Sequence, residues 1–284
     1  VEEVRSKLDH MRELECTTYK RPLGLPEPFN GLWRQQIVEW MYTLVKCCEL
    51  QHSAAAAAAH FLDVAVARNL IETPDDYQLV AMTALYVSLK MYDTPSLRAI
   101  KLQSLVELGN GDFNEEDILI MERDLLNIFE WRLSPPTPNC FLNECLTLLP
   151  KETSIVTRSK IEELALKAIE IAVARDSFAN MKPSTIAHSA ILMSFHRMDQ
   201  GDMPLSQLHD FLGSLEHVGD MDRNSCHLAA YNAVLLDKVL EGLQGCPEPW
   251  LETGDATTES RSHKNEYEQS GVADGVSPNS VAMQ

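Results

Sequence analysis

The stretch that most constrains the fold is residues 77–93, YQLVAMTALYVSLKMYD, where residues 79–89 are apolar except for Thr83 and Ser88. A helix that is apolar on nearly every side is buried on every side, so we expect only those two positions to face a polar environment. At about 1.5 Å per residue, such a helix is as long as a small domain is wide. It is too short, and too polar at its ends, to cross a bilayer. The stretch therefore predicts a buried central helix.

Lys90 follows this apolar run directly, and two interpretations of it are open. The lysine can pack its stem on the surface and extend its ammonium into water. Alternatively, a rigid helix holds the charge at a surface that contacts another molecule. Lys90 alone does not decide between them.

Composition limits the classes of function. The chain has 284 residues, 45% hydrophobic and 23% charged, which is typical of one large or two ordinary globular domains. Its net charge of −18 argues against a nucleic-acid partner, because such binding needs a basic surface. No signal peptide or membrane-spanning run is present, so we expect no membrane partner and a location in the nucleus, the cytoplasm or both. The seven cysteines lack metal-ligand spacing, and we expect neither a metal nor a cofactor.

Apolar residues at helical spacing recur along the chain, and no segment alternates as a strand does. The fold class is therefore predicted to be all-α. Helix-start signals are expected at Asn30, Ser53, Thr73–Pro74 and Asn114. After a short N-terminal helix, further helices are expected at 31–49, 53–70, 74–93, 96–107 and 115–130, and then at 140–149, 154–178, 183–198, 205–212 and 222–242.

The proline-rich segment SPPTP at 134–138 divides these helices into two groups of five. We expect an N-terminal helix with a proline-rich lead-in at 1–29, a first repeat at 30–135 and a second repeat at 136–245. The remaining residues, 246–284, are small, polar and acidic, and a disordered tail is expected there because they cannot bury enough apolar surface to fold.

Five pieces of the first half together resemble the cyclin box, in the order and nearly the spacing of that family. They are WRQQIVEWM (33–41), FLD (61–63), YQLVAMTALYVSLKMYD (77–93), DILIMERDLL (117–126) and WRLSPPT (131–137). The resemblance is strong over about residues 30–137. It is weaker over 138–244, where KPSTIAHSAIL at 182–192 is similar to the second helical repeat of cyclins. The resemblance implies two tandem five-helix repeats.

The resemblance also implies roles for particular residues. Lys90 and Glu122 match the lysine and glutamate that contact the kinase partner, and Met91, Trp131 and Leu133 match apolar positions on the same face. Arg34 and Asp63 match an internal salt bridge. Trp33, Trp40, Tyr77 and Gln78 fall where the family has a shallow groove that docks substrate and inhibitor peptides.

The residues themselves leave simpler alternatives open. Lys90 and Glu122 can be ordinary solvated charges, and Trp33, Trp40 and Tyr77 can be core residues rather than groove residues. Arg34 and Asp63 lie on otherwise apolar helices, where an unpaired charge is costly, so both interpretations make them structural.

No nucleophile, phosphate-loop or metalloprotease motif is present, so we expect a protein that is not an enzyme. The resemblance implies a cyclin that binds and activates a cyclin-dependent kinase in cell-cycle control. The alternative is a cyclin-fold transcription factor that contacts DNA or the basal transcription machinery. Ser277, before Pro278, is a candidate phosphorylation site in the expected tail.

Overall fold

The computed structural model describes residues 1–22, 31–71, 73–92, 102–109, 112–199, 201–218 and 223–243. Within these ranges the chain forms only helices, which confirms the predicted all-α class. The elements are α1 (Glu2–Cys16), α2 (Gly31–Cys47), α3 (His52–Ala67), α4 (Pro74–Met91), α5 (Leu102–Leu108), α6 (Glu115–Ile128), α7 (Pro138–Leu146), α8 (Ile155–Ala174), the 3-10 helix η2 (Asp176–Phe178), α9 (Pro183–His196), α10 (Leu205–Val218) and α11 (Arg223–Leu243).

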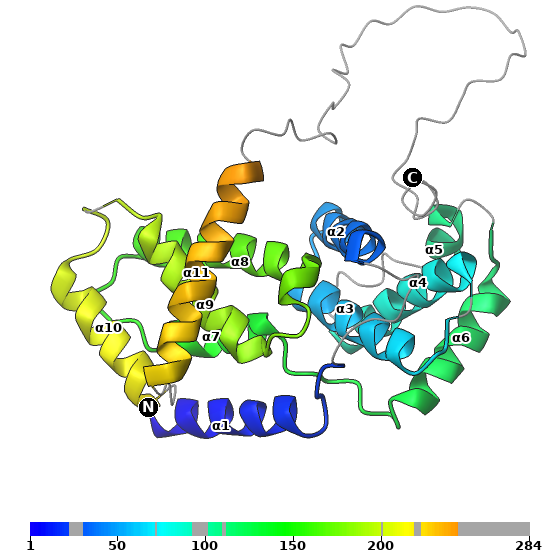
Figure 1. The fold of residues 1–284 in the computed structure, drawn as a ribbon, viewed down its shortest axis with the longest axis horizontal. Helices are drawn as coiled ribbons and strands as arrows, with labels where there is room; N and C mark the ends of the chain where they lie inside the picture. The colour runs from blue at the N-terminus through cyan, green and yellow to red at the C-terminus, as the bar shows by residue number, and fades with distance from the viewer. Residues whose placement is uncertain are drawn as a thin grey trace, which may run out of the picture.

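The helices form two groups side by side, with α2 to α6 in one and α7 to α11 in the other (Figure 1). Helix α1 lies along the second group although it precedes the first in sequence. In the first group α4 packs against α3 and α6, and in the second α9 packs against α8 and α11. The expected tail at 246–284, with Ser277, lies outside the described residues.

Helix α4 is the buried centre of the first group, as predicted. The expectation that Thr83 and Ser88 face a polar environment is wrong, because both side chains are fully buried. Thr83 Oγ1 donates a hydrogen bond of 2.7 Å to the carbonyl of Leu79 one turn earlier. A threonine that satisfies its hydroxyl on its own helix can face the core.

Capping side chains set the starts of α4 and α6. The Thr73 hydroxyl accepts from the backbone of Asp76, whose carboxylate accepts from the backbone of Thr73. Asn114 and Asp117 form the same reciprocal arrangement at α6. Such capping boxes satisfy backbone donors that the first turn leaves free, and both predicted starts are confirmed.

Other predicted boundaries are shifted. Ser53 does not cap α3, because the helix begins one residue earlier and Ser53 is a buried residue of its first turn. Helix α7 begins at Pro138, where proline fits the first turn and the Thr137 hydroxyl accepts from the backbone of Cys140. Helix α10 continues to Val218, beyond the predicted end at 212. Asn30 and the predicted start of the helix at 96–107 lie outside the described residues.

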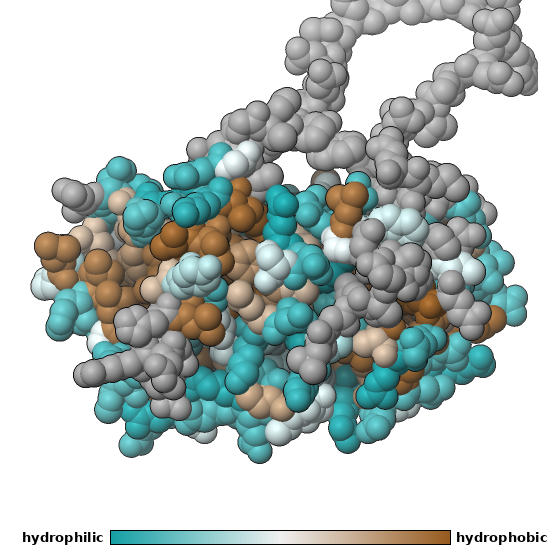
Figure 2. Space-filling model, viewed as in Figure 1, coloured by the Kyte–Doolittle hydropathy of each residue, from teal (hydrophilic) through white to brown (hydrophobic). Residues whose placement is uncertain are grey.

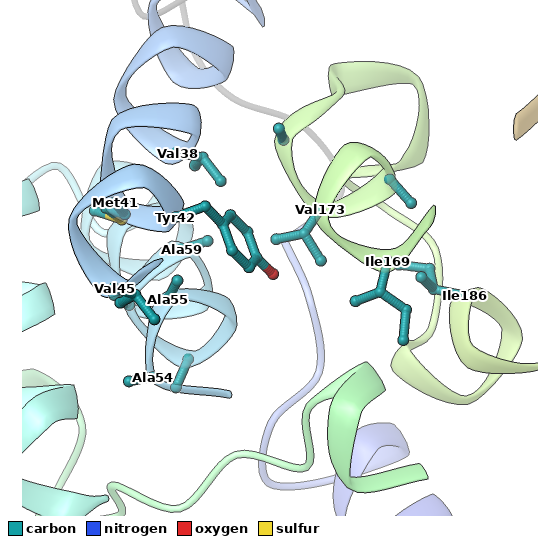
Figure 3. Packing of buried hydrophobic residues seen from close by; sticks show 14 of the residues in the cluster. Val38, Met41, Tyr42, Val45, Ala54, Ala55, Ala59, Ile169, Val173 and Ile186 are labelled. Carbon is teal, nitrogen blue, oxygen red and sulfur yellow. The ribbon is translucent and has the colours of Figure 1, made fainter. Parts of the chain in front are cut away.

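The two groups share one apolar core. Tyr42 points from α2 toward Val173 of α8, and Ile169 and Ile186 lie beyond (Figure 3). The C-terminal end of α8 also accepts hydrogen bonds from the first group, because Arg34 Nη1 donates to the carbonyls of Val173 at 2.8 Å and Ala174 at 3.2 Å. Apolar contact and buried hydrogen bonds together orient one repeat on the other.

Candidate functional site

The end of α4 and the middle of α6 bring Lys90 and Glu122 together. The Lys90 ammonium donates to both carboxylate oxygens of Glu122, at 2.7 and 2.9 Å. The Lys90 side chain is 45% exposed and that of Glu122 is 14% exposed. The ion pair therefore lies at the protein surface, with its carboxylate side largely covered.

Helical periodicity explains why Glu122 faces Lys90. Glu122 follows Ile118 by four residues and precedes Leu125 by three, and both of these side chains are fully buried. Residues at these spacings share one helix face, so Glu122 lies at the edge of the face that packs on α4. Lys90 belongs to the last turn of α4, where a cation also complements the helix dipole.

Tyr86 contacts Lys90 from the same helix. The Lys90 ammonium lies 4.0 Å from the centroid of the Tyr86 ring. Partial burial favours a lower pKa for Lys90, but the hydrogen bond to Glu122 and the interaction with Tyr86 outweigh it, and the pKa is raised. Lys90 is therefore a charged ammonium at neutral pH.

Exposed apolar side chains are found near this ion pair in sequence, on the two helices or within a few residues of the end of α6. Met91 is 44% exposed and Trp131 is 71% exposed, while Leu133 is half-buried against the core. Leu119, one turn before Glu122 on α6, is 49% exposed and was not predicted. The sequence could have indicated Leu119, because this leucine lies outside the apolar stripe of the helix, which begins with Ile118.

The backbone that follows α6 has two residues with positive φ, and Trp131 is the second of them. Glu130 and Trp131 have φ values of 50° and 61°, in the left-handed region that residues with side chains rarely adopt. The Trp131 amide donates to the carbonyl of Leu126 at 3.0 Å, which closes the end of the helix. Glu49 and Asn69 close α2 and α3 with positive φ in the same way, so this conformation ends helices in this chain and does not by itself mark a functional site.

Three of the four residues expected to line a peptide groove are buried. Trp40, Tyr77 and Gln78 are only 4%, 3% and 3% exposed, and Trp33 alone is half-buried. The Trp33 ring meets the Tyr77 ring edge-on, with 6.3 Å between the centroids. Trp40 falls on the inner stripe of α2 beside Ile37 and Met41, so packing makes it a core residue. The expectation that all four line a surface groove is corrected on this point.

Arg34 and Asp63 form a buried ion pair between α2 and α3. Arg34 donates through Nε and Nη2 to the two Asp63 oxygens, at 2.7 and 2.9 Å. Burial favours a lower pKa for Arg34, but Asp63 outweighs it and the pKa is raised. Arg21 lies 3.8 Å from the same carboxylate and donates to the carbonyl of Ala179. The pair is buried inside the first repeat and is not part of a binding surface, while Arg34 Nη1 also links this repeat to α8 of the second.

The buried pair of Cys145 and His188 is not arranged as a second site. Cys145 and His188 are buried 3.8 Å apart, and burial raises the pKa of Cys145 to about 12 and lowers that of His188 to about 4. A neutral thiol beside a neutral imidazole is not an activated nucleophile. Among the described residues, no group of His, Cys, Asp or Glu could hold a metal ion, and no helix is long and apolar enough to cross a membrane.

Comparison with known proteins agrees with the two helical groups. The family model for the cyclin N-terminal domain matches residues 6–134, and the model for the cyclin C-terminal domain matches residues 136–231. Two similar relatives are Cyclin-A3-3 and Putative cyclin-B3-1 of Arabidopsis thaliana. The first is 23% identical over 205 residues, 70% of this chain and 61% of that protein. The second is 27% identical over 161 residues, 56% of this chain and 37% of that protein.

The chain therefore spans less than two thirds of the length of these relatives. Among solved structures, a viral cyclin from Herpesvirus saimiri has a similar fold, with a TM-score of 0.57 and 17% identity over 82% of this chain and 99% of that one. Both helical repeats thus match cyclin domains in sequence, and their arrangement matches a cyclin in three dimensions. The chain belongs to the cyclin family.

Proposed function

We propose that this cyclin-family chain binds and activates a cyclin-dependent protein kinase, as a non-catalytic subunit with a role in cell-cycle control. The observation that carries the proposal is the exposed Lys90–Glu122 ion pair, with exposed Met91 and Trp131 close to it in sequence. Interfaces gain affinity from a few apolar and aromatic anchors and gain register from polar contacts. This surface offers both.

The physical basis of activation would be a rigid surface that stabilises one kinase conformation. Both site helices begin with capping boxes and pack on the core, so we expect the ion pair to keep its geometry when a partner binds. A partner that binds only the active conformation shifts the kinase population toward that state. The kinase would supply all catalytic groups.

The docking of substrate or inhibitor peptides stays a prediction for the surface that includes Trp33, because the other three expected residues are buried. A location in the nucleus, the cytoplasm or both is part of the same proposal. The alternative role in contacting DNA has no supporting observation, since the net charge of the chain is −18.

The test combines affinity purification, identification of bound kinases by mass spectrometry, and assay of their activity. We expect the double variant Lys90→Glu with Glu122→Lys to lose kinase binding and activation. The reversed charges can still pair with each other, so helix content and melting temperature should stay near wild type. A double variant that still activates its kinase would contradict the proposal.

A matched control is available in the same chain. Lys46 and Glu170 form an ion pair of 2.6 Å between α2 and α8, with side chains 49% and 21% exposed. Reversing Lys46 and Glu170 makes the same change of charge at an exposed pair on other helices. We expect this control to keep kinase binding, so a loss in both double variants would indicate a general effect of charge reversal.

A further inference from the structure

The position of Tyr86 suggests a role beyond packing. It lies on α4 four residues before Lys90, a spacing that places the two side chains on one helix face. The Tyr86 side chain is half-buried and packs against the core, so its ring is held in place. The Lys90 ammonium lies 4.0 Å from the ring centroid, within the range of a cation–π interaction.

An exposed lysine usually samples many rotamers, and ordering it on binding costs free energy. Lys90 is restrained from two elements in the free protein. Glu122 of α6 accepts two hydrogen bonds from it, and the Tyr86 ring of α4 contacts the same ammonium. The ordering cost is therefore largely met before a partner arrives.

We propose that Tyr86 is a positioning residue, which holds the Lys90 ammonium in the geometry that the kinase partner meets. Its contribution to affinity rests on the proposed function, whereas its effect on Lys90 is a property of the free protein. The two parts are therefore tested separately. Glu122 holds the ammonium from α6, and the Tyr86 ring contacts the same ammonium from α4.

The first experiment measures Lys90 in the free chain of residues 1–284 by NMR of its side-chain ammonium and Cε groups, assigned with Lys90→Met. A ring facing the ammonium shifts these signals, and a cation–π contact slows exchange of the ammonium protons with water. We expect Tyr86→Leu to remove both effects and Tyr86→Phe, which keeps the ring, to retain them. Unchanged Lys90 signals in Tyr86→Leu, or equal loss in both variants, would overturn the role of the ring.

The second experiment is a double-mutant cycle with the kinase recovered in the affinity purification. We expect Tyr86→Leu to weaken binding about 2- to 30-fold when Lys90 is present, the range that a cation–π contact supports. In the Lys90→Met background the same change should have no effect. An equal loss in both backgrounds would show that Tyr86 acts by itself or through the fold, and would overturn the proposal.

A matched control is a tyrosine at the surface of the second repeat. Tyr231→Leu removes an exposed tyrosine from α11 in the second repeat and should change neither the Lys90 signals nor kinase affinity. If the wild-type chain binds no kinase, the proposed function fails, and the NMR experiment alone decides whether Tyr86 positions Lys90.

Discussion

Glu15 near the end of α1 caps α9, a helix that begins 168 positions later in the chain. Its carboxylate accepts a hydrogen bond of 3.0 Å from the backbone of Ser184 and one of 2.6 Å from the Ser184 hydroxyl. The N-cap residue of α9, Lys182, makes no side-chain capping bond. A carboxylate at a helix N-terminus also complements the helix dipole. The N-terminal helix thus completes an element of the second repeat.

Replacing Glu15 should therefore loosen α1. Loss of a capping side chain costs about 0.5–2 kcal/mol, and the buried Ser184 hydroxyl would also lose its partner. We expect Glu15→Ala to lower the free energy of unfolding by about 1–3 kcal/mol in denaturant titration and to speed proteolysis within α1. Glu13→Ala, at an exposed position of the same helix, is the control, and equal stability of the two variants would contradict this role.

The buried ion pair should matter for folding. Asp63→Ala would leave Arg34 and Arg21 without their shared carboxylate, and breaking a buried pair costs about 3–5 kcal/mol. We expect the free energy of unfolding to fall by that amount, with kinase binding lost only as the protein unfolds. Asp9→Ala, which breaks an exposed pair with Arg12, should change stability by less than about 1 kcal/mol. A wild-type melting temperature for Asp63→Ala would contradict the prediction.

Tyr42 carries a fully buried hydroxyl for which the described residues provide no hydrogen-bond partner. An unsatisfied buried polar group costs about 1–3 kcal/mol. We expect Tyr42→Phe, which keeps the ring between the two repeats, to raise the free energy of unfolding by about 1 kcal/mol. Tyr42→Ala should lower it by about 3–5 kcal/mol, because it leaves a cavity. A Phe variant less stable than wild type would mean that the hydroxyl has a partner.

Trp131 should be a binding residue with little effect on stability, because its side chain is 71% exposed. Truncating a central aromatic anchor costs about 2–4 kcal/mol of affinity. We expect Trp131→Ala to weaken kinase binding by this amount in calorimetry and to leave the melting temperature near wild type. Leu205→Ala, on the more exposed Leu205 of α10, is the control and should keep full affinity.

Two buried histidines should lower the free energy of unfolding in acid. Burial lowers the pKa of His60 to about 3 and that of His188 to about 4, whereas both have a pKa of about 6.5 when unfolded. Between pH 6.5 and 4 the unfolded chain binds more protons, so each histidine should lower the free energy of unfolding by about 1.4 kcal/mol per pH unit as pH falls.

The pKa of Glu15, which burial raises, acts in the opposite direction, because the folded protein then binds its proton more tightly. Urea unfolding from pH 7 to 4.5 measures the sum. The double variant His60→Gln with His188→Gln should show a smaller pH slope than wild type. An unchanged slope would show that these imidazoles are not the groups responsible.

Local sequence was enough to predict the helices and several of their starts. The apolar run of α4 can be satisfied only by burial, and the capping residues Thr73 and Asn114 act within three positions of their partners. The resemblance to cyclins could also be recognised from the sequence, because its motifs occur in the family's order along the chain. What these signals share is that each depends on neighbours a few residues apart.

Only the tertiary structure decided which distant side chains meet. Lys90 and Glu122 contact each other across 32 positions, and Glu15 reaches Ser184 across 169. The sequence also did not determine that Trp40, Tyr77 and Gln78 are buried. An apolar helix face has the same sequence pattern whether it packs on the core or binds a peptide. Periodicity gives the direction of a side chain around its own helix, whereas the packing of the other helices determines what lies there.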